Sequence, residues 1–100
     1  MLTDINIKCT DIGQLLVMLR MTGGRVELPS AKLPQGEDER LGPGDYAVEV
    51  TLEHGQPGAT VICEITSGGR PVRTCQWVVP SNGEIVARCA FFITAAGKIG

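Results

Sequence analysis

Four cysteines carry most of the chemical potential of this chain, because a thiol can act as a nucleophile, bind a metal ion or form a disulfide. They are Cys9, Cys63, Cys75 and Cys89. Each lies on the apolar phase of a two-residue alternation, as Cys63 does between Val61 and Ile65. A buried thiol behaves as a small hydrophobic side chain. The sequence therefore predicts reduced cysteines inside a sheet-based core.

The compartment expected from the sequence agrees with reduced thiols. Asp4 and Asp11 surround Lys8 where a secretory signal would need positive charge, and Arg20 interrupts an apolar run that is too short to span a membrane. We therefore expect a cytoplasmic protein, in which glutathione keeps thiols reduced. A disulfide pair is the first alternative. A zinc site is the second, although the cysteines stand far apart and His54 is the only histidine.

Residues that could perform acid–base or nucleophilic catalysis do not form a recognisable set. His54 stands in a turn signal beside Gly55, so we expect it to be solvated. The acidic run Glu37-Asp38-Glu39 offers adjacent carboxylates without the fixed separation that acid–base catalysis requires. We expect no enzyme activity, no cofactor and no metal, and we keep a small thiol enzyme as a remote alternative.

Two similar segments combine a hydroxyl, two glycines and an arginine before a strand, namely Thr22-Gly23-Gly24-Arg25 and Ser67-Gly68-Gly69-Arg70. Backbone N–H groups at glycines, a hydroxyl and a guanidinium can together bind a phosphate or carboxylate. The candidate ligand residues are Thr22, Gly24, Arg25, Ser67, Gly69, Arg70 and Arg73. The alternative is two ordinary turns whose glycines supply positive φ.

An N-terminal helix is expected between about residues 12 and 22. Leu15, Leu16 and Leu19 repeat at helical spacing, and Gly23-Gly24 supplies a stop. The opposite side is also apolar, which favours packing against a second copy of the chain. The candidate interface residues are Val17, Met18 and Met21, with the charged block Glu37, Asp38, Glu39 and Arg40 as a docking arm.

Two-residue alternation predicts strands over 3–10, 25–28, 46–53, 59–66, 72–79 and 84–94. Short links rich in turn formers join the last four, so we expect an antiparallel meander. The predicted class is α+β: a β-α-β start feeds a mostly antiparallel sheet of about six strands with one N-terminal helix, and closure into a barrel or sandwich is open.

The chain is expected to form a single compact domain over 1–100, with a long irregular loop over 29–45 and a loose tail over 95–100. Its formal net charge is −2 and its nine basic residues are scattered. Without a basic stripe to neutralise phosphates, nucleic acid is not an expected partner. No stretch is long and apolar enough for a membrane span, so no membrane partner is expected either.

These observations favour a small, non-catalytic, self-associating binding protein that engages or blocks a protein partner, as accessory proteins and inhibitors do. The alternative is a binder of a small anionic ligand, such as a nucleotide, through the Gly-Gly-Arg turns. No stretch of the chain matches the motifs of a known family.

Overall fold

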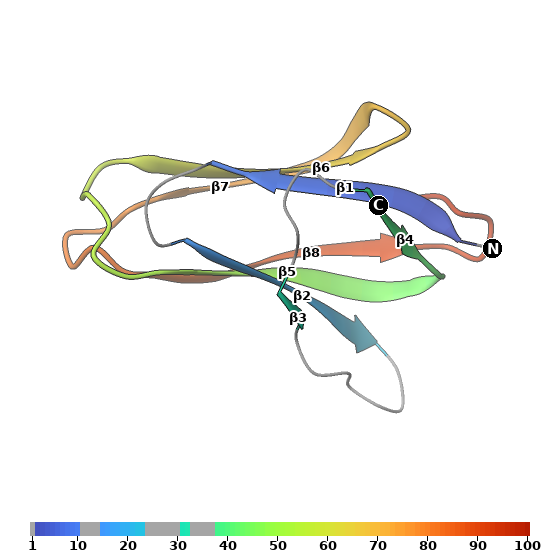
Figure 1. The fold of residues 1–100 in the computed structure, drawn as a ribbon, viewed down its shortest axis with the longest axis horizontal. Coiled ribbons are helices and arrows are strands. Elements are labelled where there is room, and N and C mark those ends of the chain that lie inside the picture. Colours follow the sequence, from blue (N-terminus) through green and yellow to red (C-terminus); the bar gives the residue numbers. More distant parts are fainter. Residues whose placement is uncertain (1, 11–14, 24–30, 33–37) are drawn as a thin grey trace.

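Eight β-strands and no helix make up the regular structure of residues 2–10, 15–23, 31–32 and 38–100, which are the residues that this computed structural model describes. The strands are β1 (Thr3–Cys9), β2 (Leu16–Gly23), β3 (Ala31–Lys32), β4 (Asp38–Leu41), β5 (Gly44–Leu52), β6 (Thr60–Ser67), β7 (Arg70–Val78) and β8 (Ile85–Ile93). Sheet A has the order β4-β1-β6-β7 and sheet B the order β3-β2-β5-β8, and every pairing is antiparallel. Figure 1 shows β1, β6 and β7 in one layer above β2, β5 and β8 in the other. The fold is a β-sandwich, and the predicted α+β class is wrong.

The core lies between the two layers and is built from the apolar phase of each strand. Its most deeply buried members are Ile5, Ile7, Val48, Val50, Val61, Cys63, Ile65, Val79 and Cys89. Cys9 is buried as well, and Cys75 packs against the same cluster. The prediction that all four cysteines lie on core-facing positions is therefore confirmed. Alternation of this kind gives each sheet one apolar face, and two such faces exclude water from each other.

The predicted N-terminal helix is wrong, because the described part of that segment is the strand β2. Val17, Leu19 and Met21 pair with inner-face residues of β5 and lie toward the core. Leu16 and Met18 occupy the opposite face of the same strand. A strand with apolar residues on both faces lacks a clean two-residue alternation. The apolar residues of this strand therefore also fit the spacing of a helix with two apolar sides, which is why a helix was predicted. Residues 11–14, the start of the predicted helix, lie outside the described residues.

The four C-terminal strands were located correctly by the sequence, but their arrangement as a meander is wrong. Only β6 and β7 form a hairpin, whereas β5 pairs with β8 across sheet B. The links from β5 to β6 and from β7 to β8 cross from one sheet to the other (Figure 1). Short turn-rich links are compatible with both a hairpin and a crossing between layers. Link length alone therefore did not distinguish them.

The segment predicted as an irregular loop over 29–45 contains β3, β4 and the start of β5. Residues 29–30 and 33–37 of it lie outside the described residues. The tail predicted to be loose turns back onto β8: the N–H of Thr94 donates to the carbonyl of Lys98 at 2.8 Å, and Ile93 forms a bridge with Ile99. Both segments therefore extend the sheets.

Two disulfides link the strands, so the prediction of reduced cysteines is wrong. Cys9–Cys63 joins the neighbouring strands β1 and β6, with Cα atoms 4.0 Å apart. Cys75–Cys89 joins β7 of sheet A to β8 of sheet B, with Cα atoms 6.0 Å apart. Core-facing positions and strand register bring these thiols together, and register was not readable from the sequence.

The disulfides also bear on the compartment. Stable disulfides form in oxidising environments and are rare in the cytoplasm. They therefore favour an oxidising environment over the expected cytoplasmic one. Among the residues that the structure describes, no helix is long and apolar enough to cross a membrane.

The two disulfides should stabilise the fold unequally. Cys9–Cys63 spans 54 residues and Cys75–Cys89 spans 14. The chain-entropy treatment gives a loss of about 4 kcal/mol for the Cys9→Ala/Cys63→Ala variant and about 3 kcal/mol for Cys75→Ala/Cys89→Ala. Urea unfolding under non-reducing conditions measures both. Wild-type free energies of unfolding in the two double variants would contradict this prediction.

Candidate functional site

The outward faces of the two sheets differ in chemistry. On sheet A the outward positions are almost all polar: Asp4, Asn6, Lys8, Asp38, Arg40, Glu64, Thr66, Thr74 and Gln76, with Ile62 and Val78 as apolar members. On sheet B they are Leu16, Met18, Ala47, Val86, Ala90 and Phe92, together with Arg20, Thr22, Asp45, Glu49, Thr51 and Arg88. Half of the sheet B positions are thus apolar. We call this set of twelve the sheet B face, and it is the candidate interaction surface.

Several apolar side chains of the sheet B face are open to solvent. Val86 is 87% exposed, Phe92 46% and Leu16 43%. Single exposed apolar residues are common on protein surfaces. Here Leu16 and Val86 flank Thr51 in one row of the sheet, and Phe92 lies toward the other end of β8. Apolar groups that recur across one face, among polar ones, are typical of a surface that contacts another molecule.

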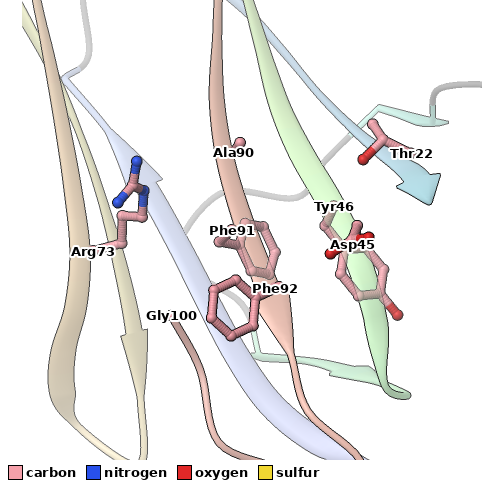
Figure 2. Close-up of a pocket in the computed structure, with 8 residues that line it drawn as sticks. All are labelled: Thr22, Asp45, Tyr46, Arg73, Ala90, Phe91, Phe92 and Gly100. Carbon is pink, nitrogen blue, oxygen red and sulfur yellow. The ribbon is translucent and has the colours of Figure 1, made fainter.

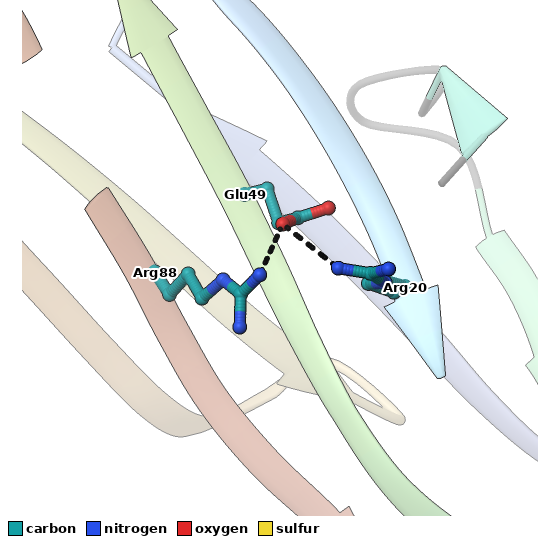
Figure 3. A network of polar contacts seen from close by, with 3 residues as sticks. All are labelled: Arg20, Glu49 and Arg88. Carbon is teal, nitrogen blue, oxygen red and sulfur yellow. Dashed lines mark ion pairs between the residues drawn. The ribbon is translucent and has the colours of Figure 1, made fainter. Parts of the chain in front are cut away.

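A charged cluster lies near the middle of the sheet B face. One carboxylate oxygen of Glu49, Oε2, lies 3.0 Å from Nη2 of Arg88 and 3.9 Å from Nη1 of Arg20 (Figure 3). The Glu49 and Arg20 side chains are 21% and 27% exposed, and that of Arg88 is 57% exposed. Glu49 and Arg88 are also cross-strand partners in the sheet. Glu49 thus holds two guanidinium groups together on this face, and the more exposed one, that of Arg88, can donate to an acceptor on a partner.

A shallow hollow of about 460 Å³ adjoins the end of the sheet B face (Figure 2). It is lined by Thr22, Asp45, Tyr46, Arg73, Ala90, Phe91, Phe92 and Gly100. The rings of Tyr46 and Phe91 stack with their centroids 5.3 Å apart. A Cβ at Gly100 would contact the ring of Phe92, so a larger residue there would require that exposed ring to move. Figure 2 shows Arg73 on one side of the hollow and Asp45 and Thr22 on the other.

Two of the predicted anion-binding residues, Thr22 and Arg73, line this one hollow. Ser67 and Gly69 do not line it. They belong to the β6–β7 hairpin, in which Gly68 and Gly69 have φ values of 58° and 78°, as a two-residue turn requires. The Oγ of Ser67 donates to the carbonyl of Asp4 at 2.8 Å, and Arg70 is exposed at the start of β7. Gly24 and Arg25 lie outside the described residues.

The predicted interface residues are divided between different surfaces. Val17 is 3% exposed and Met21 packs against the core, whereas Met18 lies on the sheet B face. These residues therefore do not form the second apolar face of a helix, which was the reason to expect self-association through them.

The predicted docking arm is part of sheet A. Asp38, Glu39 and Arg40 belong to β4, and Glu37 lies outside the described residues. Asn6 Nδ2 donates to Asp38 Oδ1 at 3.0 Å, and Arg40 Nε lies 3.4 Å from Asp4 Oδ1. This charged block thus pairs with β1 along the edge of sheet A.

The central residues of the sheet B face were not predicted from the sequence as a site. Glu49, Val86 and Arg88 each stand on the outward phase of a correctly located strand. Only the pairing of β5 with β8 and β2 brings them onto one surface with Arg20. The alternation alone could have placed each of them on a solvent face, but it could not have joined them.

The two disulfides involve all four cysteine sulfurs, and none of the cysteines is free. In this state no cysteine offers a thiolate as a nucleophile or as a zinc ligand. Within the described ranges, no group of three or more His, Cys, Asp or Glu side chains is placed to hold a metal ion.

Comparison of this chain with protein-family models, with curated proteins and with solved structures finds no match.

Tyr46 should make stability depend on pH in the alkaline range. Its hydroxyl donates to the carbonyl of Gly42 at 2.7 Å, and burial raises its pKa above the ordinary 10.0. Folding therefore favours the neutral phenol, and this contribution is present below about pH 10 and is lost as the pH rises through the folded-state pKa.

The Tyr46→Phe variant should lose about 1 kcal/mol at pH 7 with the hydrogen bond, and its stability should fall less steeply above pH 10. Chemical unfolding of the variant and the wild type between pH 7 and 11 measures both effects. Equal alkaline slopes in the two proteins would show that Tyr46 does not couple folding to pH.

Proposed function

We propose that this protein is a non-catalytic binding protein that engages a partner protein through the sheet B face. The observation that carries the proposal is the chemical difference between the two outward faces of the sandwich. One is mostly polar, with Ile62 and Val78 as its exposed apolar members, whereas the other has apolar residues at half of its positions around a central charged cluster.

The composition of the sheet B face supports a protein partner. Protein interfaces combine apolar contact area with polar groups that set orientation, and arginine and aromatic residues are enriched in them. Phe92 and Val86 supply exposed apolar area, and Arg20 and Arg88 supply guanidinium groups that Glu49 holds in place. The exposed guanidinium of Arg88 would donate hydrogen bonds to acceptors on the partner.

The disulfides support a finer statement about where this binding occurs. A small sandwich joined both within a sheet and between its sheets is suited to an oxidising compartment, such as the extracellular space. In that setting the protein would act as an accessory or inhibitory protein, which binds a target and alters its contacts without changing it chemically.

A pair of matched substitutions tests the use of the sheet B face. Val86→Glu adds a charge to this face, and Ile62→Glu adds the same charge to the outward face of sheet A, where Ile62 is 41% exposed. Both positions face solvent, so neither variant should unfold. Affinity capture from an extract of the source, followed by titration of the captured protein, should show at least a tenfold loss of affinity for Val86→Glu and little change for Ile62→Glu.

The opposite order of effects would contradict the proposal. Light scattering of the purified protein extends the test to self-association, since an assembly of this chain through the sheet B face would also be dissociated by Val86→Glu and not by Ile62→Glu. A strict monomer that captures no partner would remove the proposal altogether.

A further inference from the structure

One edge of sheet B exposes backbone groups along β8. The N–H of Phe92 donates to the carbonyl of Gly100 at 2.9 Å, and the N–H of Gly100 donates to the carbonyl of Phe92 at 3.1 Å. Phe92 thus directs its backbone groups away from β5. In an antiparallel pair, alternate residues direct both groups to the same side. The backbone groups of Val86, Arg88 and Ala90 therefore point away from β5 as well.

The outward backbone groups of Val86, Arg88 and Ala90 have no strand beside them in the described part of the chain, whereas those at the C-terminal end of β8 are paired with the tail. The tail covers it at Ile93 and Phe92 through the pairings with Ile99 and Gly100. Among the described residues, no strand pairs with Val86, Arg88 or Ala90 on that side. The tail shows that the β8 edge accepts an antiparallel strand, and the open stretch continues from the point where the tail pairing stops. An edge of this kind can pair with an extended segment of another chain.

The two strands at this edge, β7 and β8, carry only positive charges, although Glu84 precedes β8 and Asp45 lines the hollow at its far end. The strands β7 and β8 contain Arg70, Arg73 and Arg88 and no acidic residue, in a chain of net charge −2. Arg88 is paired with Glu49, whereas Arg73 is exposed and has no ion-pair partner among the described residues. The described residues therefore neutralise the basic character of this edge only in part.

Arg73 lies next to the open edge because of the disulfide between the sheets. Cys75–Cys89 holds β7 beside β8, and Arg73 and Phe91 each stand two residues from a cysteine of that pair. Arg73, Phe91 and Ala90 line the same hollow. Figure 2 shows Arg73 on the opposite side of Phe91 and Phe92 from Thr22 and Asp45. A strand added to β8 would thus pass between Ala90 and the guanidinium of Arg73.

We propose that the β8 edge binds an extended acidic segment of the partner protein as an additional antiparallel strand. The proposal rests on the proposed function and narrows the partner to the chemistry of this segment. Outward side chains of the added strand would lie beside Val86 and Ala90 and would be apolar. Inward side chains of the added strand that lie opposite Phe91 would contact the guanidinium of Arg73 and would therefore be carboxylates. The segment therefore alternates apolar and acidic residues, with main-chain hydrogen bonds to Val86, Arg88 and Ala90.

A second copy of β8 fits this edge less well. β8 contains Arg88 and no acidic residue, so two copies paired through the open stretch would place Arg88 opposite Arg88, with only the Glu49 that each copy already pairs with its own Arg88 nearby. Like charges in cross-strand positions are destabilising. Charge complementarity thus favours an acidic partner segment over self-pairing of this strand.

Capped hexapeptides that alternate Val with Glu, and matched ones that alternate Val with Lys, test the proposal. The Glu peptide should slow hydrogen exchange of the Arg88 and Ala90 amides at least tenfold, and the Lys peptide should not. Arg73→Glu should reverse this preference. Equal effects of the two peptides, or no protection of these amides by either peptide at millimolar concentration, would overturn the proposal.

Two proline variants locate the added strand. Ala90→Pro removes an edge N–H without removing a bond to β5. Gln76→Pro does the same on β7, because Val79 directs its backbone groups toward Ala59 and Gly58 and Gln76 therefore directs its own outward. Ala90→Pro should weaken binding of the Glu peptide at least tenfold, and Gln76→Pro should not. The reverse order would place the added strand on β7 and overturn the proposal.

The same variants separate this proposal from the proposed function. If the captured partner protein were lost by Val86→Glu and retained by Ala90→Pro, binding through the sheet B face would stand and strand addition would fail. Loss of the partner in both variants, with retention in Gln76→Pro, is the expected result.

Discussion

The disulfide between Cys75 and Cys89 is the constraint on which the arrangement of the two sheets most depends. It joins the last strand of sheet A to the last strand of sheet B, so the two layers cannot slide past each other at that edge. The apolar faces of the sheets supply most of the attraction, but hydrophobic contact has no direction of its own. The covalent link between Cys75 and Cys89 fixes the position of β7 relative to β8, and with it the alignment of the two sheets. Cys9–Cys63 then ties β1 to the centre of sheet A.

The same alignment gives the surface its chemistry. It places the guanidinium of Arg73, which belongs to sheet A, beside the open edge of sheet B and its hollow. The pairing of β5 with β8 brings Glu49 and Arg88 together on the neighbouring face. A basic edge and a mixed apolar and charged face thus meet along β8. This combination is the basis for the proposed acidic, partly apolar partner.

Most strands, the core phase and the core position of the cysteines could be predicted from the sequence, because two-residue alternation reports which side chains face inward. The pairing of strands could not, since the link after Val79 is equally compatible with a hairpin and with a crossing between layers. Whether Cys63 is bonded could not be predicted either, because its disulfide partner depends on which strand lies beside β6. β2 was misassigned because Leu16 and Met18 make its outward face apolar too. The sheet B face combines residues of three strands, so it followed only from the register.

Peptide mapping of the unreduced native protein by mass spectrometry tests the central claim most directly. The structure predicts one cross-linked pair that joins the peptides of Cys9 and Cys63 and a second that joins those of Cys75 and Cys89. Four thiols that react with an alkylating agent in the unfolded but unreduced protein would contradict the account. A link between Cys63 and Cys75, which are neighbours within sheet A, would contradict it as well, because it would leave the two sheets without a covalent connection.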